Sequence, residues 1–198
     1  MSEIINLVFV DCETTGLDPE RDHIVEVAAV RVDNTYAPLQ TFHAYILPKI
    51  PVPEHVAKIN GYSKEVWEER GAISIGSLFH SGFFEVIRGG TYAGQNPGFD
   101  RSFLERSYAL WRENAVSKSE ICPAYPEMDY HLIDVASLAY PLQAAGLIPG
   151  VGLRHTRKLF DLKGEQHRAL SDVLDTIEVF KKLMAIYTDG GIKRRWQR

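Results

Sequence analysis

The stretch from Ile5 to Leu17 reads INLVFVDCETTGL and places two carboxylates at the end of an apolar, valine-rich run. The run from Ile5 to Cys12 predicts a buried β-strand. Because successive side chains of a strand point to opposite faces, Asp11 and Glu13 share one face, whereas Cys12 points toward the core. Neighbouring carboxylates repel each other unless protons or a cation intervene, and oxygen ligands of this kind suit Mg²⁺ or Mn²⁺.

The segment that follows the two acids, Thr14 to Leu17, makes a binding site a stronger hypothesis. Hydroxyl groups and a tight glycine turn can bring backbone N–H groups to a phosphate or a sugar. An Asp-x-Glu pair by itself is more typical of two solvated acids where a strand emerges. The pair therefore needs partners elsewhere in the chain before it indicates a metal site.

The segments around this strand predict an α/β fold, a sheet with helices on its faces. Turn residues at 16–19 and 32–34 connect the first three strands as an antiparallel meander. After Pro51 the apolar period becomes helical, and residues 79, 83, 86 and 87 share one face of a helix. The other expected strands are 24–32, 40–47 and 91–93; the expected helices are 99–111, 133–140, 153–160 and 170–184, with an irregular stretch at 114–130.

Two further segments place acids at helix starts. Residues 94–100, GQNPGFD, predict a strand end, a Pro-Gly turn and a helix with Asp100 in its first turn. Residues 167–172, HRALSD, place His167 at the start of the last helix and Asp172 one turn inside it, beside the apolar face. Taken singly, an acid in a first helical turn and a histidine at a helix start are typical of capping or surface residues.

Taken together and in this order, the three segments resemble the DEDDh exonuclease family, which includes the epsilon proofreading subunit of bacterial DNA polymerase III, RNase T and oligoribonuclease. The resemblance extends over about residues 6–187. It implies an RNase H-like fold, in which helices flank a mixed five-stranded sheet. It also implies two divalent cations, Mg²⁺ or Mn²⁺, held by four acids: Asp11, Glu13, Asp100 and Asp172.

The same resemblance assigns roles to other residues. His167 matches the general base, so the implied catalytic set is the four acids with His167. Thr14, Thr15 and Leu17 match positions that contact the terminal nucleotide, with the leucine wedged between the last two bases. Further implied substrate-binding residues are Ile59, Asn60, Asn96 and Phe99. Family members commonly have His-Asn where this chain has Gln95-Asn96, a difference that does not affect the metal site.

These assignments imply a metal-dependent phosphodiester hydrolase. The expected activity is 3′→5′ exonuclease action on single-stranded or frayed DNA ends, by a two-metal-ion mechanism that releases nucleoside 5′-monophosphates in proofreading or repair. Nothing in the motifs separates DNA from RNA, so an RNA 3′→5′ exonuclease stays an alternative. A catalytically silent nucleic-acid-binding module is another, although the complete set of acids argues against it. The implied partners are a nucleic acid 3′ end and a DNA polymerase.

Length and composition are those of one globular domain. The chain has 198 residues and a net charge of −4, and no apolar run approaches the ~18–20 residues that span a bilayer. Its two cysteines, Cys12 and Cys122, are expected as free thiols of a cytoplasmic protein. We expect an exonuclease domain over residues 1–190 and a basic tail over 191–198.

Two other groups of polar residues receive structural interpretations. Asp134 precedes a helical run and is expected to cap the helix rather than to bind a metal. Arg154, His155 and Arg157 could contact backbone phosphate or form a solvated basic face, and the solvated face is the favoured interpretation.

Overall fold

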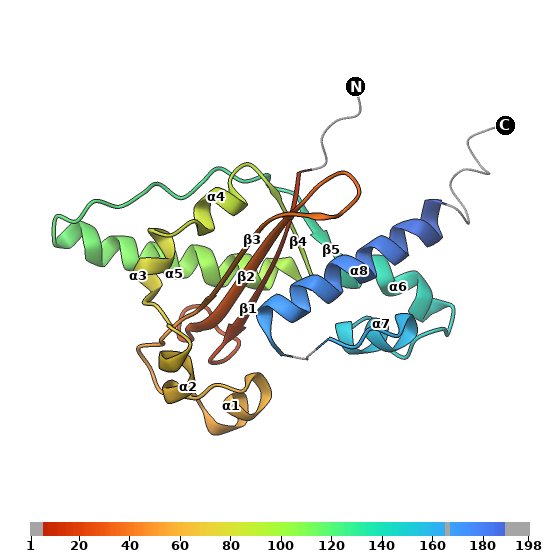
Figure 1. The fold of residues 1–198 in the computed structure, drawn as a ribbon, viewed down its shortest axis with the longest axis horizontal. Coiled ribbons are helices and arrows are strands. Elements are labelled where there is room, and N and C mark those ends of the chain that lie inside the picture. The colour runs from red at the N-terminus through yellow and green to blue at the C-terminus, as the bar shows by residue number, and fades with distance from the viewer. Residues whose placement is uncertain (1–5, 165–166, 189–198) are drawn as a thin grey trace.

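The central strand of the structure is β1 (Leu7–Thr14), in a five-stranded sheet of order β3-β2-β1-β4-β5 (Figure 1). The computed structural model describes residues 6–164 and 167–188. β2 (Ile24–Val32) and β3 (Pro38–Tyr45) continue β1 as an antiparallel meander. β4 (Thr91–Gly94) and β5 (Leu132–Asp134) add parallel strands on the other side. This mixed sheet confirms the expected α/β fold.

β1 extends beyond its parallel neighbour. Its register with β4 covers only Leu7 to Phe9, whereas its register with β2 reaches Thr14. Within the described ranges, therefore, no strand pairs with the β4 side of β1 from Val10 onward. Asp11 and Glu13 lie in this open part of β1, at an edge where other elements can approach them.

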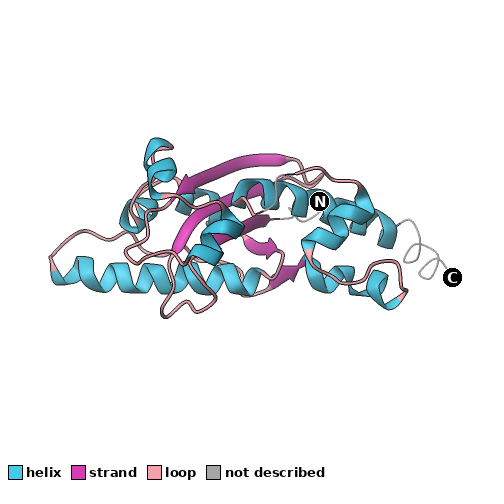
Figure 2. Ribbon diagram, turned by 90° about the horizontal axis from the view of Figure 1, so that it is seen from below, coloured by secondary structure: helices cyan, strands magenta, loops and turns pink. Residues whose placement is uncertain are grey.

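Helices cover both faces of the sheet (Figures 1 and 2). One face carries α3 (Ile75–Phe79), α4 (Phe83–Ile87) and α5 (Pro97–Ser117), and the other carries α6 (Val135–Ala144) and α8 (Ala169–Tyr187). Alternate residues of β1 divide between the two apolar clusters: Val8, Val10 and Cys12 pack on the α5 side, and Leu7 and Phe9 on the α8 side. Asp11 and Glu13 therefore share the α8 side.

The remaining helices are short. α7 (Leu153–Phe160) packs against α8. α1 (Glu54–Asn60) and α2 (Lys64–Glu69) lie near the end of β1 (Figure 1). No helix in the described part of the chain is long and apolar enough to cross a bilayer.

The prediction of a single helix through residues 79–87 was wrong. α3 ends at Phe79 and α4 begins at Phe83, although the apolar side chains of both enter the same core. The hydroxyl of Ser81 donates to the carbonyl of Leu78 at 2.6 Å and accepts from the N–H of Phe83 at 3.3 Å. These local bonds replace the helical ladder at the break, a competition that periodicity alone does not reveal.

The boundaries around β5 were also predicted incorrectly. α5 continues to Ser117 instead of ending near Trp111, and the helix expected at 133–140 begins only at Val135, after the strand β5. Asp134 caps α6, since its carboxylate accepts from the N–H groups of Ala136 and Ser137 at 3.0 and 3.2 Å. The expected capping role of Asp134 is thus confirmed, and the cap marks where the strand changes into a helix.

Candidate active site

The two acids of β1 form the floor of the site. In the register of the sheet, Asp11 lies opposite Ala28 and Glu13 lies opposite Glu26, so both acids point to the face that α8 covers. Both are partly buried. The expectation that they share a face while Cys12 enters the core is confirmed, because Cys12 is buried among apolar residues on the opposite face.

Asp100 is attached directly to this strand. It lies in the first turn of α5, is 3% exposed, and its Oδ1 accepts a 2.8 Å hydrogen bond from the backbone N–H of Cys12. Asn96 begins the helix in a left-handed conformation (φ 63°), and its N–H donates to Asp134 at 3.0 Å. This turn reverses the chain so that the first turn of α5 meets the backbone between Asp11 and Glu13.

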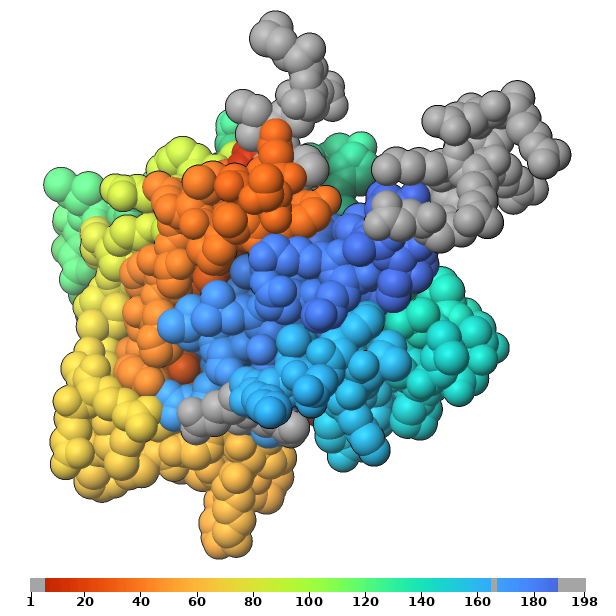
Figure 3. All heavy atoms as spheres, turned by 45° about the vertical axis from the view of Figure 1, so that its right-hand side comes forward, coloured from red at the N-terminus to blue at the C-terminus, as the bar shows by residue number. Residues whose placement is uncertain are grey.

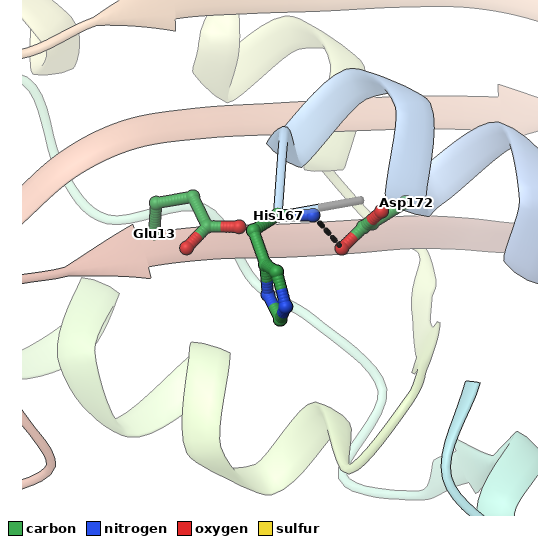
Figure 4. A group of neighbouring side chains, drawn as sticks. All are labelled: Glu13, His167 and Asp172. Atoms are coloured by element: carbon green, nitrogen blue, oxygen red, sulfur yellow. Dashed lines mark hydrogen bonds between the residues drawn. The ribbon is translucent and has the colours of Figure 1, made fainter. Parts of the chain in front are cut away.

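The third segment approaches from α8. Ligand atoms of Glu13, His167 and Asp172 lie within 4.8 Å of one another. Figure 4 shows His167 between the two acids, with its backbone N–H donating to Oδ2 of Asp172 at 3.3 Å. His167 has a positive φ of 58°, and its side chain is exposed. The structure thus brings together residues that are more than 150 positions apart in the sequence.

A buried arginine holds the outer side of Asp172. Arg157, on α7, is 4% exposed and its Nη2 lies 2.5 Å from Oδ1 of Asp172. Its Nε lies 2.5 Å from Oδ2 of Asp175, one turn further along α8. The interpretation of Arg157 as part of a solvated basic face was therefore wrong. The pair leaves Oδ2 of Asp172 directed toward His167 and Glu13.

The carboxylates are difficult to ionise together. Burial raises the pKa of Asp11 well above its ordinary value, and the charges of Asp100, Glu13 and Asp172 raise it further. Burial also raises the pKa of Glu13 to about 7 and that of Asp100 to about 8. The pKa of Asp172 is raised by burial, although Arg157 opposes the shift. Near neutral pH the site therefore favours either protons or a positive ion.

These residues fit divalent cations. Asp11, Glu13, Asp100 and Asp172 supply several hard oxygen donors, which is the ligand set that Mg²⁺ and Mn²⁺ prefer. The Arg157 ion pair engages Oδ1 of Asp172, and Oδ2, which accepts from the N–H of His167, keeps a lone pair for a cation. Binding cations would also relieve the mutual repulsion that raises the carboxylate pKa values.

In the hairpin after β1, the three predicted nucleotide contacts differ in exposure and in hydrogen bonding. Leu17 is 84% exposed, as a residue that contacts a ligand base requires. Thr15 is 1% exposed, and its hydroxyl donates to Asp22 at 3.0 Å and accepts from the N–H of His23 at 2.9 Å. The hydroxyl of Thr14 donates to the carbonyl of Gly16 at 2.5 Å. Both threonines therefore shape the hairpin, and their predicted nucleotide contacts stay predictions.

The other predicted substrate residues differ in their burial and contacts. Asn60 is buried and its Nδ2 donates to the carbonyl of Thr14 at 3.2 Å, which attaches α1 to β1. Ile59 and Asn96 are exposed. The ring of Phe99 is partly buried and lies 4.8 Å from that of Phe103, so it packs on the core. Their substrate roles stay predictions.

Sequence reasoning missed Glu26 and Arg168. Glu26 is 1% exposed beside Glu13, and it accepts from His43 at 2.8 Å and from Nε of Arg168 at 3.2 Å. A glutamate inside the apolar run IVEVAAV of β2 is a signal that could have revealed it. Neither the sequence around Arg157 nor that around Arg168 indicates its partner, because each pairing joins different elements.

Comparison with known proteins identifies the class of protein that carries this fold and this acidic site, a class of exonucleases. The family model RNase T, described as an exonuclease, matches residues 8–180. The chain belongs to this exonuclease family.

Individual relatives carry related names. The chain is 30% identical over 187 residues to DNA polymerase III subunit epsilon of Rickettsia conorii, covering 89% of this chain and 73% of the relative. It is 28% identical over 190 residues to DNA polymerase III PolC-type of Caldanaerobacter subterraneus, covering 94% of this chain. A solved structure of Exonuclease X in complex with 5′ overhanging duplex DNA superposes with a TM-score of 0.63 at 21% identity, covering 91% of this chain and 92% of that one.

Coverage of the relatives differs widely. The chain spans 12% of the PolC-type polymerase and 49% of another epsilon subunit, from Rickettsia typhi. The likeness to Exonuclease X shows a shared fold.

The Arg157 ion pairs generate a stability prediction. Arg157→Met leaves the carboxylates of Asp172 and Asp175 buried without this cation, and we expect it to destabilise the fold by about 3–5 kcal/mol. Urea unfolding monitored by circular dichroism measures the change. Lys58→Met is the control, because Lys58 pairs with Glu54 at a fully solvated site (72% and 83% exposed) and should show no measurable change. Equal stability of the two variants would contradict a structural role for Arg157.

The raised pKa values generate a pH prediction. Glu13 and Asp100 bind protons more tightly in the folded than in the unfolded chain, so stability without metal should fall as pH rises from about 5 to 8. Thermal unfolding in chelator measures this slope. Adding Mg²⁺ or Mn²⁺ should raise the melting temperature at pH 8 and have little effect at pH 5, where protons compete for the ligands.

Glu13→Gln is the matched variant for this measurement. It keeps the shape of the side chain and removes one titrating group, so the pH slope should become shallower. A metal-free protein whose stability is flat, or rises, between pH 5 and 8 would contradict the proposed charge crowding.

Proposed function

We propose that this chain is a 3′→5′ exonuclease that hydrolyses single-stranded or frayed DNA ends to nucleoside 5′-monophosphates, using two divalent cations, Mg²⁺ or Mn²⁺. The proposal rests on one observation, the meeting of acids from β1, α5 and α8 with His167 at the open end of β1. Membership of the exonuclease family supports it. A purely binding module would gain nothing from such crowding of carboxylates, which costs free energy when no cation is bound.

Each acid has a proposed place in the cation site. Asp11, Glu13 and Asp172 would hold one ion, and Asp11 and Asp100 the other. When bound, the ions would supply activation of the attacking water and neutralisation of charge on the scissile phosphodiester. The hydrogen bond from Cys12 to Asp100 and the ion pair from Arg157 to Asp172 keep two of these carboxylates in place before any ligand arrives.

His167 is the proposed general base. Its imidazole is exposed beside Glu13 and Asp172, and imidazole nitrogens accept protons near neutral pH. The left-handed backbone of His167 and its N–H bond to Asp172 position the ring relative to the acids. A ring nitrogen would take the proton from the attacking water, and the proton then leaves through the exposed side of the ring.

The end of the strand is the proposed site of attack. The exposed Leu17 would separate the last two bases, while the hairpin of Thr14 and Thr15 and the side of Asn60 enclose the terminal sugar. A paired end would first have to unstack at a cost of a few kcal/mol, so single strands and frayed ends should be preferred. DNA and a polymerase partner are proposed because the relatives are named as DNA polymerase III proteins.

Shortening of labelled strands tests this function. We expect stepwise release of mononucleotides from 5′-labelled single-stranded DNA with Mg²⁺ or Mn²⁺, none in chelator, and none from Asp11→Asn. Matched RNA is assayed in parallel, and faster shortening of RNA would replace DNA by RNA as the substrate. A strand protected at its 3′ end but still shortened would contradict the polarity, and no shortening of either strand would contradict the enzymatic function.

Replacing the proposed base gives a second prediction. His167→Ala should lower turnover roughly 10²–10⁴-fold while Mn²⁺ binding, measured by calorimetry, changes little. His131→Ala is the control, because His131 is exposed beside Asp129 at the start of β5 and outside the acidic site. Normal turnover in His167→Ala would remove the base assignment, and loss of Mn²⁺ binding would make His167 a metal ligand instead.

A further inference from the structure

A second groove adjoins the acidic site on the same face of the sheet. It has a volume of about 450 Å³, and its lining includes Tyr45, Arg70 and Arg168 with Leu170, Ser171 and Leu174 of α8. In Figure 3 the orange β2 and β3, the yellow segment after α2 and the blue start of α8 meet on this face. None of the roles proposed above uses this groove.

The register of the sheet sets the distance between groove and acids. Glu13 lies opposite Glu26, and Glu26 lies opposite Tyr45, so the three side chains form a row across β1, β2 and β3. Two strand spacings separate Glu13 from Tyr45, which is about 10 Å. Arg168 immediately follows His167, and its charge lowers the pKa of Glu13 against the effect of burial. The groove therefore lies beside the acidic site, two strands away from Glu13 at its far side.

Two guanidinium groups converge on one neutral oxygen in this groove. Nη1 of Arg70 donates to the hydroxyl of Tyr45 at 3.0 Å, and Nη2 of Arg168 donates to the same hydroxyl at 2.5 Å. Both guanidiniums also stack on aromatic rings, with the carbon of each guanidinium 5.2–5.8 Å from the ring centres of Tyr45 and Trp67. Like charges held this close repel each other, and a bound anion would relieve that repulsion.

The carboxylate that lines this groove bonds one of its two arginines. Glu26 is the carboxylate of the groove, and it already accepts from both Arg168 and His43. Arg70 is exposed and makes no ion pair with any carboxylate in the described parts of the chain. Within the described residues, Arg70 is thus the arginine of this groove that has no carboxylate partner.

The position of Arg70 is rigidly determined. It is the C-terminal cap of α2, and the preceding turn of that helix is anchored by Trp67, whose Nε1 donates to the carbonyl of Val25 at 2.6 Å. Trp67 is fully buried. An arginine held by a buried anchor and an aromatic face loses little conformational entropy when it binds a ligand.

We propose that the groove around Arg70 and Arg168 binds a backbone phosphate of the substrate strand, on the 5′ side of the bond that is cut. This inference rests on the proposed function, because it assigns a second contact to the same strand. A guanidinium fork matches the oxygens of a phosphodiester, and the apolar Leu170 and Leu174 offer a surface for the adjoining sugar or base. The site would hold the strand in register while the terminal bond lies over the acids.

Binding of single-stranded DNA tests the proposal without requiring cleavage. In an Asp11→Asn background, Arg70→Gln should weaken binding of a labelled oligothymidine about tenfold, as measured by fluorescence anisotropy. The slope of log affinity against log salt should become shallower by about 0.7, as for one lost phosphate contact. Arg112→Gln is the control, because Arg112 is an exposed arginine of α5 far along the helix from the acids.

Oligonucleotides with a single neutral methylphosphonate linkage locate the contact. At one position near the 3′ end the neutral linkage should weaken binding of the parent protein but not of Arg70→Gln, since the contact is already absent. Equal affinity and equal salt slope in Arg70→Gln and Arg112→Gln, with unchanged melting temperatures, would overturn the proposal. A loss of binding with a large fall in the melting temperature would also overturn it, because Arg70 would then be structural.

Different results would contradict the phosphate site and the exonuclease function. If the unmodified chain shortens DNA and Arg70→Gln does so with the same KM and kcat, the phosphate site is wrong and the exonuclease function stands. If the chain shortens no strand but its binding depends on Arg70 and on one phosphate, the groove is a nucleic-acid site and the proposed function fails.

Discussion

Carboxylates at the open end of a buried central strand are the constraint on which this structure depends. Asp11 and Glu13 emerge from an apolar strand, and Glu26 lies beside them on β2. Each additional acid brought to this place raises the pKa of Asp11 and Glu13 further. Specific partners stabilise these carboxylates: the backbone N–H of Cys12 bonds Asp100, Arg157 pairs with Asp172, and Arg168 pairs with Glu26. The negative charge that these partners do not neutralise faces the centre of the site, where cations would neutralise it.

The same partners join the structural layers. The bond from Cys12 to Asp100 attaches α5 to β1, the pair of Arg157 with Asp172 attaches α7 to α8, and Arg168 attaches the start of α8 to β2. The same contacts therefore stabilise the charged acids and hold them in position. Changing any of these partners would disturb both the stability of the layers and the spacing of the acids, because a buried charge without a partner is costly.

Local patterns predicted much of this arrangement. The buried strand with its two acids, the helices over 153–160 and 170–184, Asp100 in a first helical turn and the Asp134 cap depend on neighbours within a few positions. The break between α3 and α4 was missed because the Ser81 side chain decides it, and β5 was missed because its pairing with β4 decides it. The length of α5 was missed as well. The proposed tail at 191–198 lies outside the described residues.

The sequence by itself determined which residue types could bind cations and on which elements they lie, because strand alternation and helix starts are local properties. It also determined the family, through the order of the three segments. Only the tertiary structure decided that Arg157 is buried against Asp172, that Thr15 is enclosed in its hairpin, and that Arg70 and Arg168 share one hydroxyl. These contacts join residues from separate elements, and their free energy depends on burial, which no short stretch of sequence specifies.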